Sequence, residues 1–286
     1  MKYQECYLKG KEALANAGVE EAALDARLLL EHVCGTDRNY LLVHGDREVS
    51  GDQEAAYFES IQKRASRIPL QHITGVQNFM GLDFCVNEHV LIPRQDTEIL
   101  VEEVLRQMSD GSRILDMCTG SGCILISLLH YSNWCDGVGA DVSWDALQVA
   151  RNNASRLLAK KEQTSYAFVK TDLFEQIEGE FDIIVSNPPY IATDVIETLM
   201  PEVREHEPRM ALDGTEDGLF FYKRIVTESG KYLKNGGMLY FEIGYDQGQA
   251  VKSLMEQAGF REVVVVKDYA GLDRVVYGTK KEVNHV

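Results

Sequence analysis

The feature of this sequence that most restricts its fold is a regular alternation, after residue 110, of short apolar runs with longer amphipathic segments. The apolar runs have the length of β-strands, and several of the intervening segments have the length of helices. Strands are predicted at 114–117, 138–141, 166–169, 181–186, 238–243, 262–267 and 274–277, and helices at about 123–131, 145–158 and 219–234. This alternation indicates a doubly wound α/β sheet with helices on both faces. Ligands of such folds bind outside the carboxyl ends of the strands, where the strand order reverses.

The first part of the chain has a different pattern. Up to about residue 66, apolar residues recur at helical spacing, which predicts a small all-α helical bundle. Ser50 is the expected N-cap of a helix that runs to about Arg67. From Phe79 to Ile92 the apolar runs become short and partly alternating around residues 86–89, which predicts a β-hairpin there. We therefore divide the chain into a helical domain at 1–75, a β-hairpin linker at 76–93 and a larger domain at 94–286.

The length of the chain agrees with two domains, and its cysteine content agrees with a reducing compartment. At roughly 150 residues per domain, 286 residues suggest two. The six cysteines form no C-x-x-C pair and are expected as small buried residues. The first residues show no signal-peptide pattern, and no window approaches the roughly 18 apolar residues of a membrane span. We expect a cytoplasmic protein with no membrane partner.

The net charge of −16 narrows the choice of partners. Residues 1–75 carry 9 basic and 12 acidic side chains, whereas the rest of the chain carries 20 basic and 33 acidic ones. A polyphosphate partner, whose binding releases counterions from many basic contacts, is therefore disfavoured.

A glycine-containing loop follows the first strand of the larger domain, in the segment from Asp116 to Ile124. Gly120 and Gly122 would let a ligand approach the backbone and the start of the next helix, with Thr119 and Ser121 beside them. Asp141, at the end of the next strand, is placed to accept both hydroxyl hydrogens of a ribose. The alternatives are a purely structural turn for the loop and a helix N-cap for Asp141.

The loop favours S-adenosylmethionine over a dinucleotide. Leu125 stands where the dinucleotide motif has its third glycine. The carboxyl of Asp116 beside the loop would repel a pyrophosphate but suits a cofactor with an ammonium and a sulfonium group. Asp172, after the third strand, is placed to accept from an adenine amino group, with a helix N-cap as the alternative.

The most specific motif is Asn187-Pro188-Pro189-Tyr190, directly after the fourth strand. Two prolines fix φ and remove two backbone donors, so the segment is rich in rigidly held acceptors. The side-chain oxygen of Asn187 and the carbonyl of Pro188 can engage both N–H bonds of a planar NH2 group, and Tyr190 can offer an aromatic face. This arrangement predicts methyl transfer to an amide or amine nitrogen by positioning and electrostatic stabilisation.

In these residues the chain resembles the HemK/PrmC group, the peptide-release-factor glutamine N5-methyltransferases. The resemblance covers essentially the whole chain. Besides the glycine loop and Asn187–Tyr190, it rests on Phe79-x-Gly81-x-x-Phe84-x-Val86, Val90-Leu91-Ile92-Pro93-Arg94, Asp96-Thr97-Glu98, Glu207-Pro208-x-x-Ala211-Leu212, Asp217-Gly218-Leu219, Glu242-Ile243-Gly244 and Gln247-Gly248.

The resemblance implies a class I S-adenosylmethionine-dependent methyltransferase fold with a Rossmann-like seven-stranded sheet. It implies methyl transfer to the glutamine of the Gly-Gly-Gln motif in class 1 release factors, which would modulate translation termination. Residues 119–122, Asp141, Leu173 and Asn187 would contact the cofactor, and residues 187–190 would hold the glutamine. The N-terminal domain would help to grip the release factor, and we expect a monomer. We retain Asp116 as an organiser of the loop.

Three positions depart from the family pattern. Cys118 replaces the usual first loop glycine, so a positive φ at this position would be strained. Gln95 replaces a proline, which loosens its segment, and Leu173 replaces a residue that is often aromatic, which weakens the expected stacking on adenine.

Two other functions remain open at this point. A nucleic-acid amino-methyltransferase of the adenine N6 type would present the same planar NH2 group, although such an enzyme needs a basic track for phosphates. A protein that binds the cofactor without catalysis is the third possibility. The seven histidines show no paired ligand spacing, so we expect no metal.

Overall fold

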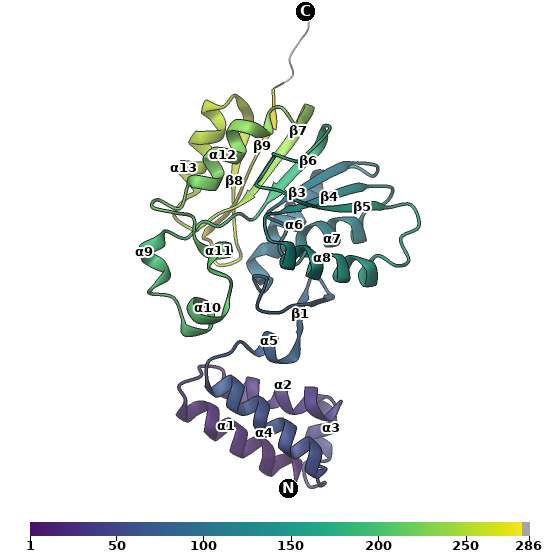
Figure 1. The fold of residues 1–286 in the computed structure, drawn as a ribbon, viewed down its shortest axis with the longest axis vertical. Helices are drawn as coiled ribbons and strands as arrows, with labels where there is room; N and C mark the ends of the chain where they lie inside the picture. Colours follow the sequence, from purple (N-terminus) through teal and green to yellow (C-terminus); the bar gives the residue numbers. More distant parts are fainter. Residues whose placement is uncertain (282–286) are drawn as a thin grey trace, which may run out of the picture. The chain divides into compact units, whose positions relative to one another are not determined.

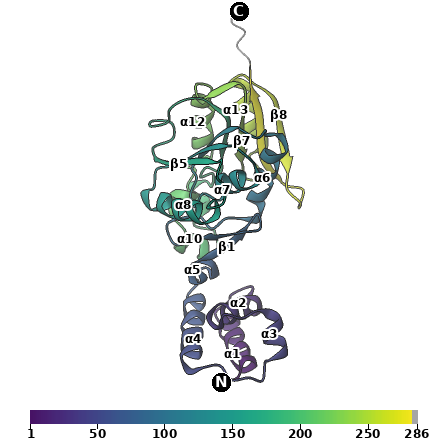
Figure 2. The same cartoon turned by 90° about the vertical axis from the view of Figure 1, so that its right-hand side faces the viewer.

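The computed structural model describes residues 1–281, which group into two units (Figures 1 and 2). The first unit comprises Met1–Val76 together with Met200–His206. The second comprises Gln77–Leu199 and the chain from Glu207 onward. The segment 200–206 thus groups with the helical unit although it belongs by sequence to the range 94–286.

The first unit is a helical bundle. Its helices are α1 (Tyr3–Asn16), α2 (Ala22–Cys34), α3 (Arg38–Val43), α4 (Gly51–Ala65) and α5 (Leu70–Thr74), and the inserted segment adds α10 (Pro201–His206). The Ser50 hydroxyl accepts a 3.3 Å hydrogen bond from the amide of Gln53, so the predicted N-cap is confirmed. The core is built from apolar side chains at helical spacing, including Leu14, Leu29 and Tyr57.

A cluster of buried charges ties α10 to this bundle. Arg64 Nε lies 2.7 Å from an Asp25 carboxylate oxygen, and Arg64 Nη2 lies 2.9 Å from Glu202. Arg67 Nη2 lies 2.7 Å from the second oxygen of Glu202. Because the side chains of Arg64, Asp25 and Glu202 are all buried, each charge depends on its partners for compensation.

A β-hairpin is present within the predicted linker 76–93, but the prediction that it centres on residues 86–89 is wrong. Strands β1 (Val76–Phe79) and β2 (Leu82–Cys85) are joined at Met80 and Gly81, whose φ angles of 51° and 71° are both left-handed. Two left-handed residues are typical of tight hairpin turns, because their twist matches that of the strands. Residues 86–89 form no hairpin turn. Instead, Val86 and Val90 pack on Ala146 and Val149.

The second unit is built on a seven-stranded sheet in the order β5-β4-β3-β6-β7-β9-β8. The strands are β3 (Arg113–Met117), β4 (Asp136–Asp141), β5 (Ser165–Lys170), β6 (Phe181–Ser186), β7 (Leu233–Glu242), β8 (Phe260–Lys267) and β9 (Asp273–Lys280). The first five are parallel, and β9 runs antiparallel to both β7 and β8. All seven predicted strands are therefore confirmed.

Helices cover both faces of the sheet, as the alternation predicts. They are α6 (Gln95–Gln107), α7 (Cys123–Tyr131), α8 (Trp144–Leu157), α12 (Phe220–Ser229) and α13 (Gly248–Gln257). The short helices α9 (Thr193–Ile196) and α11 (Arg209–Leu212) lie in the segment between β6 and α12. Figure 1 shows α12 and α13 on one face and α7 and α8 on the other. Along β6, Ile183 and Val185 pack into one core and Ile184 into the other, which explains the continuous apolar run of this strand.

One predicted helix is too long. The sequence predicts a helix over 219–234, but α12 ends at Ser229 and β7 begins at Leu233. The backbone of this stretch joins the sheet instead, because Phe181 N donates a 2.7 Å hydrogen bond to the Tyr232 carbonyl and Leu233 is in register with Phe181.

The strand order reverses at β3. This strand has β4 on one side and β6 on the other, and Met117 at its end is in register with both Ala140 and Ser186. The segments that follow Met117, Ala140 and Ser186 therefore emerge side by side at the carboxyl edge.

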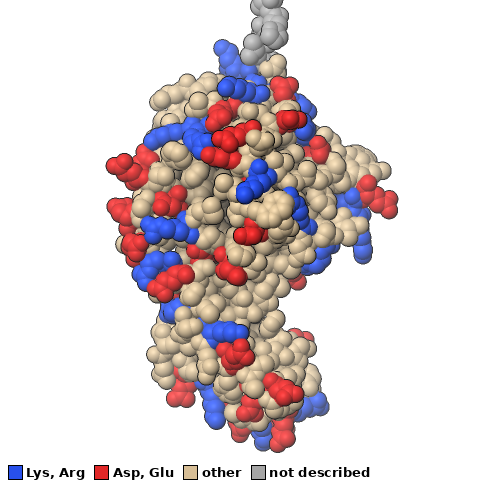
Figure 3. All heavy atoms as spheres, viewed as in Figure 1, with Lys and Arg blue, Asp and Glu red and all other residues tan. Residues whose placement is uncertain are grey.

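The charged side chains are mixed on the face in Figure 3, where Lys and Arg are interspersed with Asp and Glu. Within residues 1–281, no helix combines the length and the apolar character needed to cross a bilayer.

Candidate active site

The loop after β3 is built from left-handed residues. Cys118, Gly120 and Gly122 have φ angles of 62°, 54° and 80°. The conformation predicted to be strained at Cys118 is therefore the one it adopts. Gly122 also packs closely, since a Cβ atom there would stand 2.8 Å from Ile126 Cδ1.

Asp116 organises this loop from below. Its Oδ2 accepts hydrogen bonds from the Thr119 hydroxyl at 2.6 Å and from the amide of Leu125 at 3.3 Å. Complete burial raises the pKa of Asp116 to about 7, against the opposing effect of these bonds. Asp116 is not among the residues that line the pocket beside the loop. The structure thus agrees with the predicted role as a loop organiser, and it places the carboxyl beneath the loop and not in the pocket lining, where a cofactor contact was expected.

Asp141 occupies the position predicted for a ribose ligand. It lines the pocket at the end of β4, where its two carboxylate oxygens accept 2.9 Å hydrogen bonds from the amides of Gly120 and Ser143. Burial raises the pKa of Asp141, against these amide bonds. The N-cap of α8 is Ser143, whose hydroxyl accepts from the Ala146 amide, so Asp141 is not the helix cap that the alternative required.

Asp172 and Leu173 both line the pocket beyond β5. No helix begins at Asp172, so the N-cap alternative is wrong here too. Its carboxylate is paired with Arg224, with 2.8 Å between Oδ1 and Nη1. Leu173 is buried and has a φ of 49°.

The segment 187–190 follows β6 directly, and only two of its four residues line the pocket. Asn187 and Pro189 line the pocket, whereas Pro188 and Tyr190 do not. The Tyr190 hydroxyl donates a 3.5 Å hydrogen bond to Glu242 Oε1, and its carbonyl accepts one of 3.0 Å from Gln247 Nε2. Asn187 Nδ2 donates to the Thr97 hydroxyl at 3.4 Å, which leaves its Oδ1 as the free acceptor.

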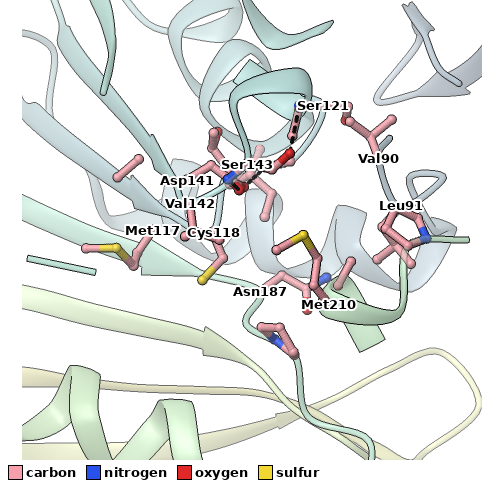
Figure 4. Close-up of a pocket in the computed structure, with 18 of the residues that line it drawn as sticks. Val90, Leu91, Met117, Cys118, Ser121, Asp141, Val142, Ser143, Asn187 and Met210 are labelled. Atoms are coloured by element: carbon pink, nitrogen blue, oxygen red, sulfur yellow. Dashed lines mark hydrogen bonds between the residues drawn. The ribbon is translucent and has the colours of Figure 1, made fainter. Parts of the chain in front are cut away.

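The pocket joins these segments (Figure 4). In this view Asp141, Val142 and Ser143 lie above Asn187 and Met210, with Cys118 between them at one side. Its empty space, which includes open solvent at the mouth, is about 960 Å³.

Sequence reasoning assigned no role to several pocket residues. Val90, Leu91, Pro93 and Arg94 reach the pocket from the segment before α6, and Pro208, Met210, Ala211 and Phe221 reach it from 207–221. The two segments are joined by an ion pair in which Arg94 Nη2 lies 2.7 and 2.9 Å from the two oxygens of Glu207. Burial raises the pKa of Glu207, against the attraction of Arg94. Both segments contain motifs of the family resemblance, Val90–Arg94 and Glu207–Leu212, and these motifs were the signal in the sequence from which their place in the pocket could have been predicted.

The lining of the pocket suits an adenosine-type cofactor. Asp141 supplies a carboxylate for ribose hydroxyls, and Val142, Leu173 and Ala146 supply apolar lining. Under the loop, Asp116 Oδ1 is buried with no hydrogen-bond donor among the described residues. Residues 120–122 lead into the start of α7, which brings backbone N–H groups to the pocket.

Comparison with known proteins gave matches along nearly the whole chain. Residues 5–75 match the family model "PrmC N-terminal domain", and residues 94–204 match "Methyltransferase small domain". The release factor glutamine methyltransferase of Caulobacter vibrioides is 43% identical over 273 residues, which cover 94% of this chain and 93% of that protein. The enzyme of the same description from Clostridium botulinum is 39% identical over 285 residues and covers 98% and 100%. A methyltransferase structure from Pyrococcus furiosus shares the fold, with a TM-score of 0.52 and 17% identity over 71% of this chain and 91% of that one.

Proposed function

The chain belongs to the release factor glutamine methyltransferase family, and on this premise we propose that it methylates the side-chain amide nitrogen of a glutamine with S-adenosylmethionine as the methyl donor. The glutamine is that of the Gly-Gly-Gln motif in class 1 peptide chain release factors, and the helical unit contributes to holding this partner. The observation that carries the proposal is that Asn187 lines the same pocket as Asp141 and Gly120.

The residues at the end of β6 are suited to hold a primary amide. Asn187 Oδ1 and the Pro188 carbonyl can each accept one N–H bond of the amide, which turns the face of its nitrogen toward the pocket. As the nitrogen becomes tetrahedral it gains positive charge, and these two acceptors stabilise that charge. The extra proton can leave to solvent afterwards, so no strong general base is required.

The cofactor, when bound, supplies the electrophilic methyl group. Asp141 holds the ribose hydroxyls, while Thr119, Gly120, Ser121 and Gly122 form the backbone of the cradle. Asp172 and Leu173 border the adenine end. Asp116 keeps the cradle in shape through Thr119 and Leu125.

The charge distribution supports a protein substrate over a nucleic acid. The chain beyond residue 75 carries 20 basic against 33 acidic residues, and the face in Figure 3 shows no continuous basic track. An enzyme that flips a base out of a duplex needs such a track for phosphates.

The test is a labelled-methyl transfer assay on a release factor, on the same factor with the motif glutamine replaced by alanine, and on nucleic acid alone. We expect label only on the intact factor. Label on the alanine variant or on nucleic acid contradicts the proposal. Calorimetry with S-adenosylmethionine accompanies this assay: cofactor binding without label on any substrate identifies a protein that only binds the cofactor.

Variants of the two key residues sharpen the test. Asn187→Ala is expected to lower the transfer rate by about 10²–10³-fold, as loss of one transition-state hydrogen-bond partner does elsewhere. Asp141→Ala is expected to weaken cofactor binding instead. A near wild-type rate for Asn187→Ala excludes this role for Asn187.

A further inference from the structure

A buried carboxyl group lies behind residues 187–190 and outside the pocket. Glu242 ends β7, where it follows Phe241, the register partner of Ser186. Its side chain is almost fully buried, with 1% of the residue exposed, and it does not line the pocket. Nothing in the proposed reaction uses this carboxyl directly.

The Glu242 carboxyl contacts Tyr190 at one end of residues 187–190 and is connected to Asn187 at the other end through Thr97. On one side, the Tyr190 hydroxyl donates to Oε1 at 3.5 Å. On the other side, Glu242 Oε2 is buried with no hydrogen-bond partner among the described residues, and the nearby Thr97 hydroxyl lowers the pKa of Glu242, as a donor to this carboxyl does. The same hydroxyl accepts from Asn187 Nδ2 at 3.4 Å. Thr97 comes from α6 and is itself buried, with 2% exposed.

The series of interactions from Glu242 through Thr97 to Asn187 determines which end of the Asn187 side-chain amide faces Thr97. A threonine hydroxyl has one proton, and an ionised carboxylate can only accept. When Thr97 gives its proton to Glu242, its oxygen can only accept from Asn187, so the amide must present its NH2 side to Thr97. The amide oxygen then points away from Thr97 and is free for the substrate.

The charged neighbours leave Glu242 without a dedicated cation. Arg274, next along β9 to the register partner of Glu242, already lies 3.2 Å from Asp96 and 3.1 Å from Asp268. Burial raises the pKa of Glu242 to about 7, against the effects of Thr97, Arg274 and Tyr190, while Asp96 adds to the rise. Two other titratable groups face Glu242. Tyr222 of α12 donates its hydroxyl to the Glu242 backbone carbonyl at 2.9 Å, and Cys123 of α7 has a pKa that burial raises and the charge of Glu242 raises further.

We propose that Thr97 and Glu242 are positioning residues that orient the Asn187 amide, so that its oxygen and not its NH2 group meets the substrate nitrogen. The inference rests on the proposed function, because only a substrate that donates N–H bonds needs this orientation. Without the hydroxyl of Thr97, the two orientations of the Asn187 side-chain amide, related by exchange of its oxygen and its NH2 group, differ little in energy. In one of them the NH2 group of Asn187 faces the NH2 group of the substrate, and no hydrogen bond can form.

The orientation has a pH dependence. A protonated Glu242 can donate to Thr97, which frees the threonine proton to face Asn187 and reverses the preferred direction of the amide. The transfer rate of the wild type should therefore fall as the pH falls through about 7.

The experiment compares Thr97→Val, Thr97→Ser and Glu242→Gln in single-turnover transfer to a release factor. We expect Thr97→Val and Glu242→Gln to lower the rate about 10- to 100-fold, with the Kd for S-adenosylmethionine little changed. Thr97→Ser keeps the hydroxyl and should retain a near wild-type rate. Glu242→Gln should also lose the acid limb of the pH profile. Ser229→Ala is the control, since it removes a buried hydroxyl that bonds only within its own helix.

The outcomes separate the two proposals. No transfer by the wild type overturns the proposed function and this inference with it. Transfer by the wild type, with an unchanged rate in Thr97→Val, overturns the inference alone. An equal loss in Thr97→Ser and Thr97→Val also overturns it, because the hydroxyl is then not the cause. If Thr97→Val does not fold, the pH profile of Glu242→Gln decides: an acid limb like that of the wild type overturns the inference.

Discussion

Gly218 lies directly against the backbone of Tyr190: a Cβ atom built on Gly218 would stand 2.3 Å from the Tyr190 carbonyl oxygen. The same carbonyl accepts the 3.0 Å hydrogen bond from Gln247 Nε2. Residues 187–190 are therefore held from behind by a glycine and a glutamine that lie far along the chain.

Gly218→Ala should displace this segment and impair transfer. Because both the carbonyl and its partner would have to move, we expect the rate to fall about 100-fold in a methyl-transfer assay. Gly111→Ala is the matched control: Gly111 has a similarly left-handed φ of 80°, but nothing lies within 4 Å of its Cβ position. An equal loss of rate in both variants would mean that backbone strain, and not the contact with Tyr190, is responsible.

The left-handed conformation of Cys118 has a measurable cost. Cys118→Gly and Cys118→Ala both remove the sulfur, but only alanine keeps a Cβ atom at a φ of 62°. We expect the glycine variant to have a free energy of unfolding about 1 kcal/mol higher than the alanine variant in urea titrations. Equal stabilities would show that the loop tolerates a side chain here without strain.

Stability should depend on pH through Asp116. Burial raises its pKa from 3.8 to about 7, so the native state binds more protons than the unfolded chain between these values. The contribution of Asp116 to stability is therefore complete below about pH 4 and is lost as the pH rises toward 7.

Asp116→Asn removes this contribution while it keeps an oxygen for Thr119 and Leu125. Between pH 5 and pH 7, we expect the wild type to lose about 2 kcal/mol more free energy of unfolding than the variant. Glu242 titrates in the same direction in both proteins, so its contribution cancels in the difference. Parallel stability curves for the two proteins would contradict the assignment.

The buried charges of the helical unit should be sensitive to loss of their cation. Arg64→Met leaves Asp25 and Glu202 buried without this partner, and we expect a loss of about 3–5 kcal/mol, measured by hydrogen exchange of the α4 amides. Lys63→Met is the neighbouring control. Its ion pair with Glu59 is exposed to solvent and should contribute little to stability. Similar losses in both variants would rule out a special role for burial.

The strands were predictable because each is a local pattern of apolar residues. In β6 the pattern is a continuous apolar run, because its alternate side chains pack into two different cores. The errors occurred where tertiary contacts override local preference. The end of α12 is decided by pairing of residues 232–233 with Phe181. The hairpin turn is held at Met80, whose amide donates to Glu98 and whose carbonyl accepts from the Tyr131 hydroxyl.

The residues of the candidate site also fall into those that the local sequence predicted and those that only tertiary contacts revealed. Gly120, Asp141 and Asn187 were found because each directly follows a strand, and parallel strands end at one edge. Thr97 and Glu242 appeared only as motifs without a role, because their relation to Asn187 spans 90 residues in one direction and 55 in the other.

The sequence by itself determined the alternating sheet, the helical bundle and the acceptor-rich segment 187–190, since periodicity and proline chemistry act over a few residues. Only the tertiary structure decided which carboxyl groups serve the ligand and which are buried supports. Asp141 and Asp116 both adjoin the same loop, yet one lines the pocket and the other lies beneath it with a pKa of about 7. The reason is physical: burial and hydrogen-bond partners set the charge of a carboxyl group, and both are properties of the folded chain.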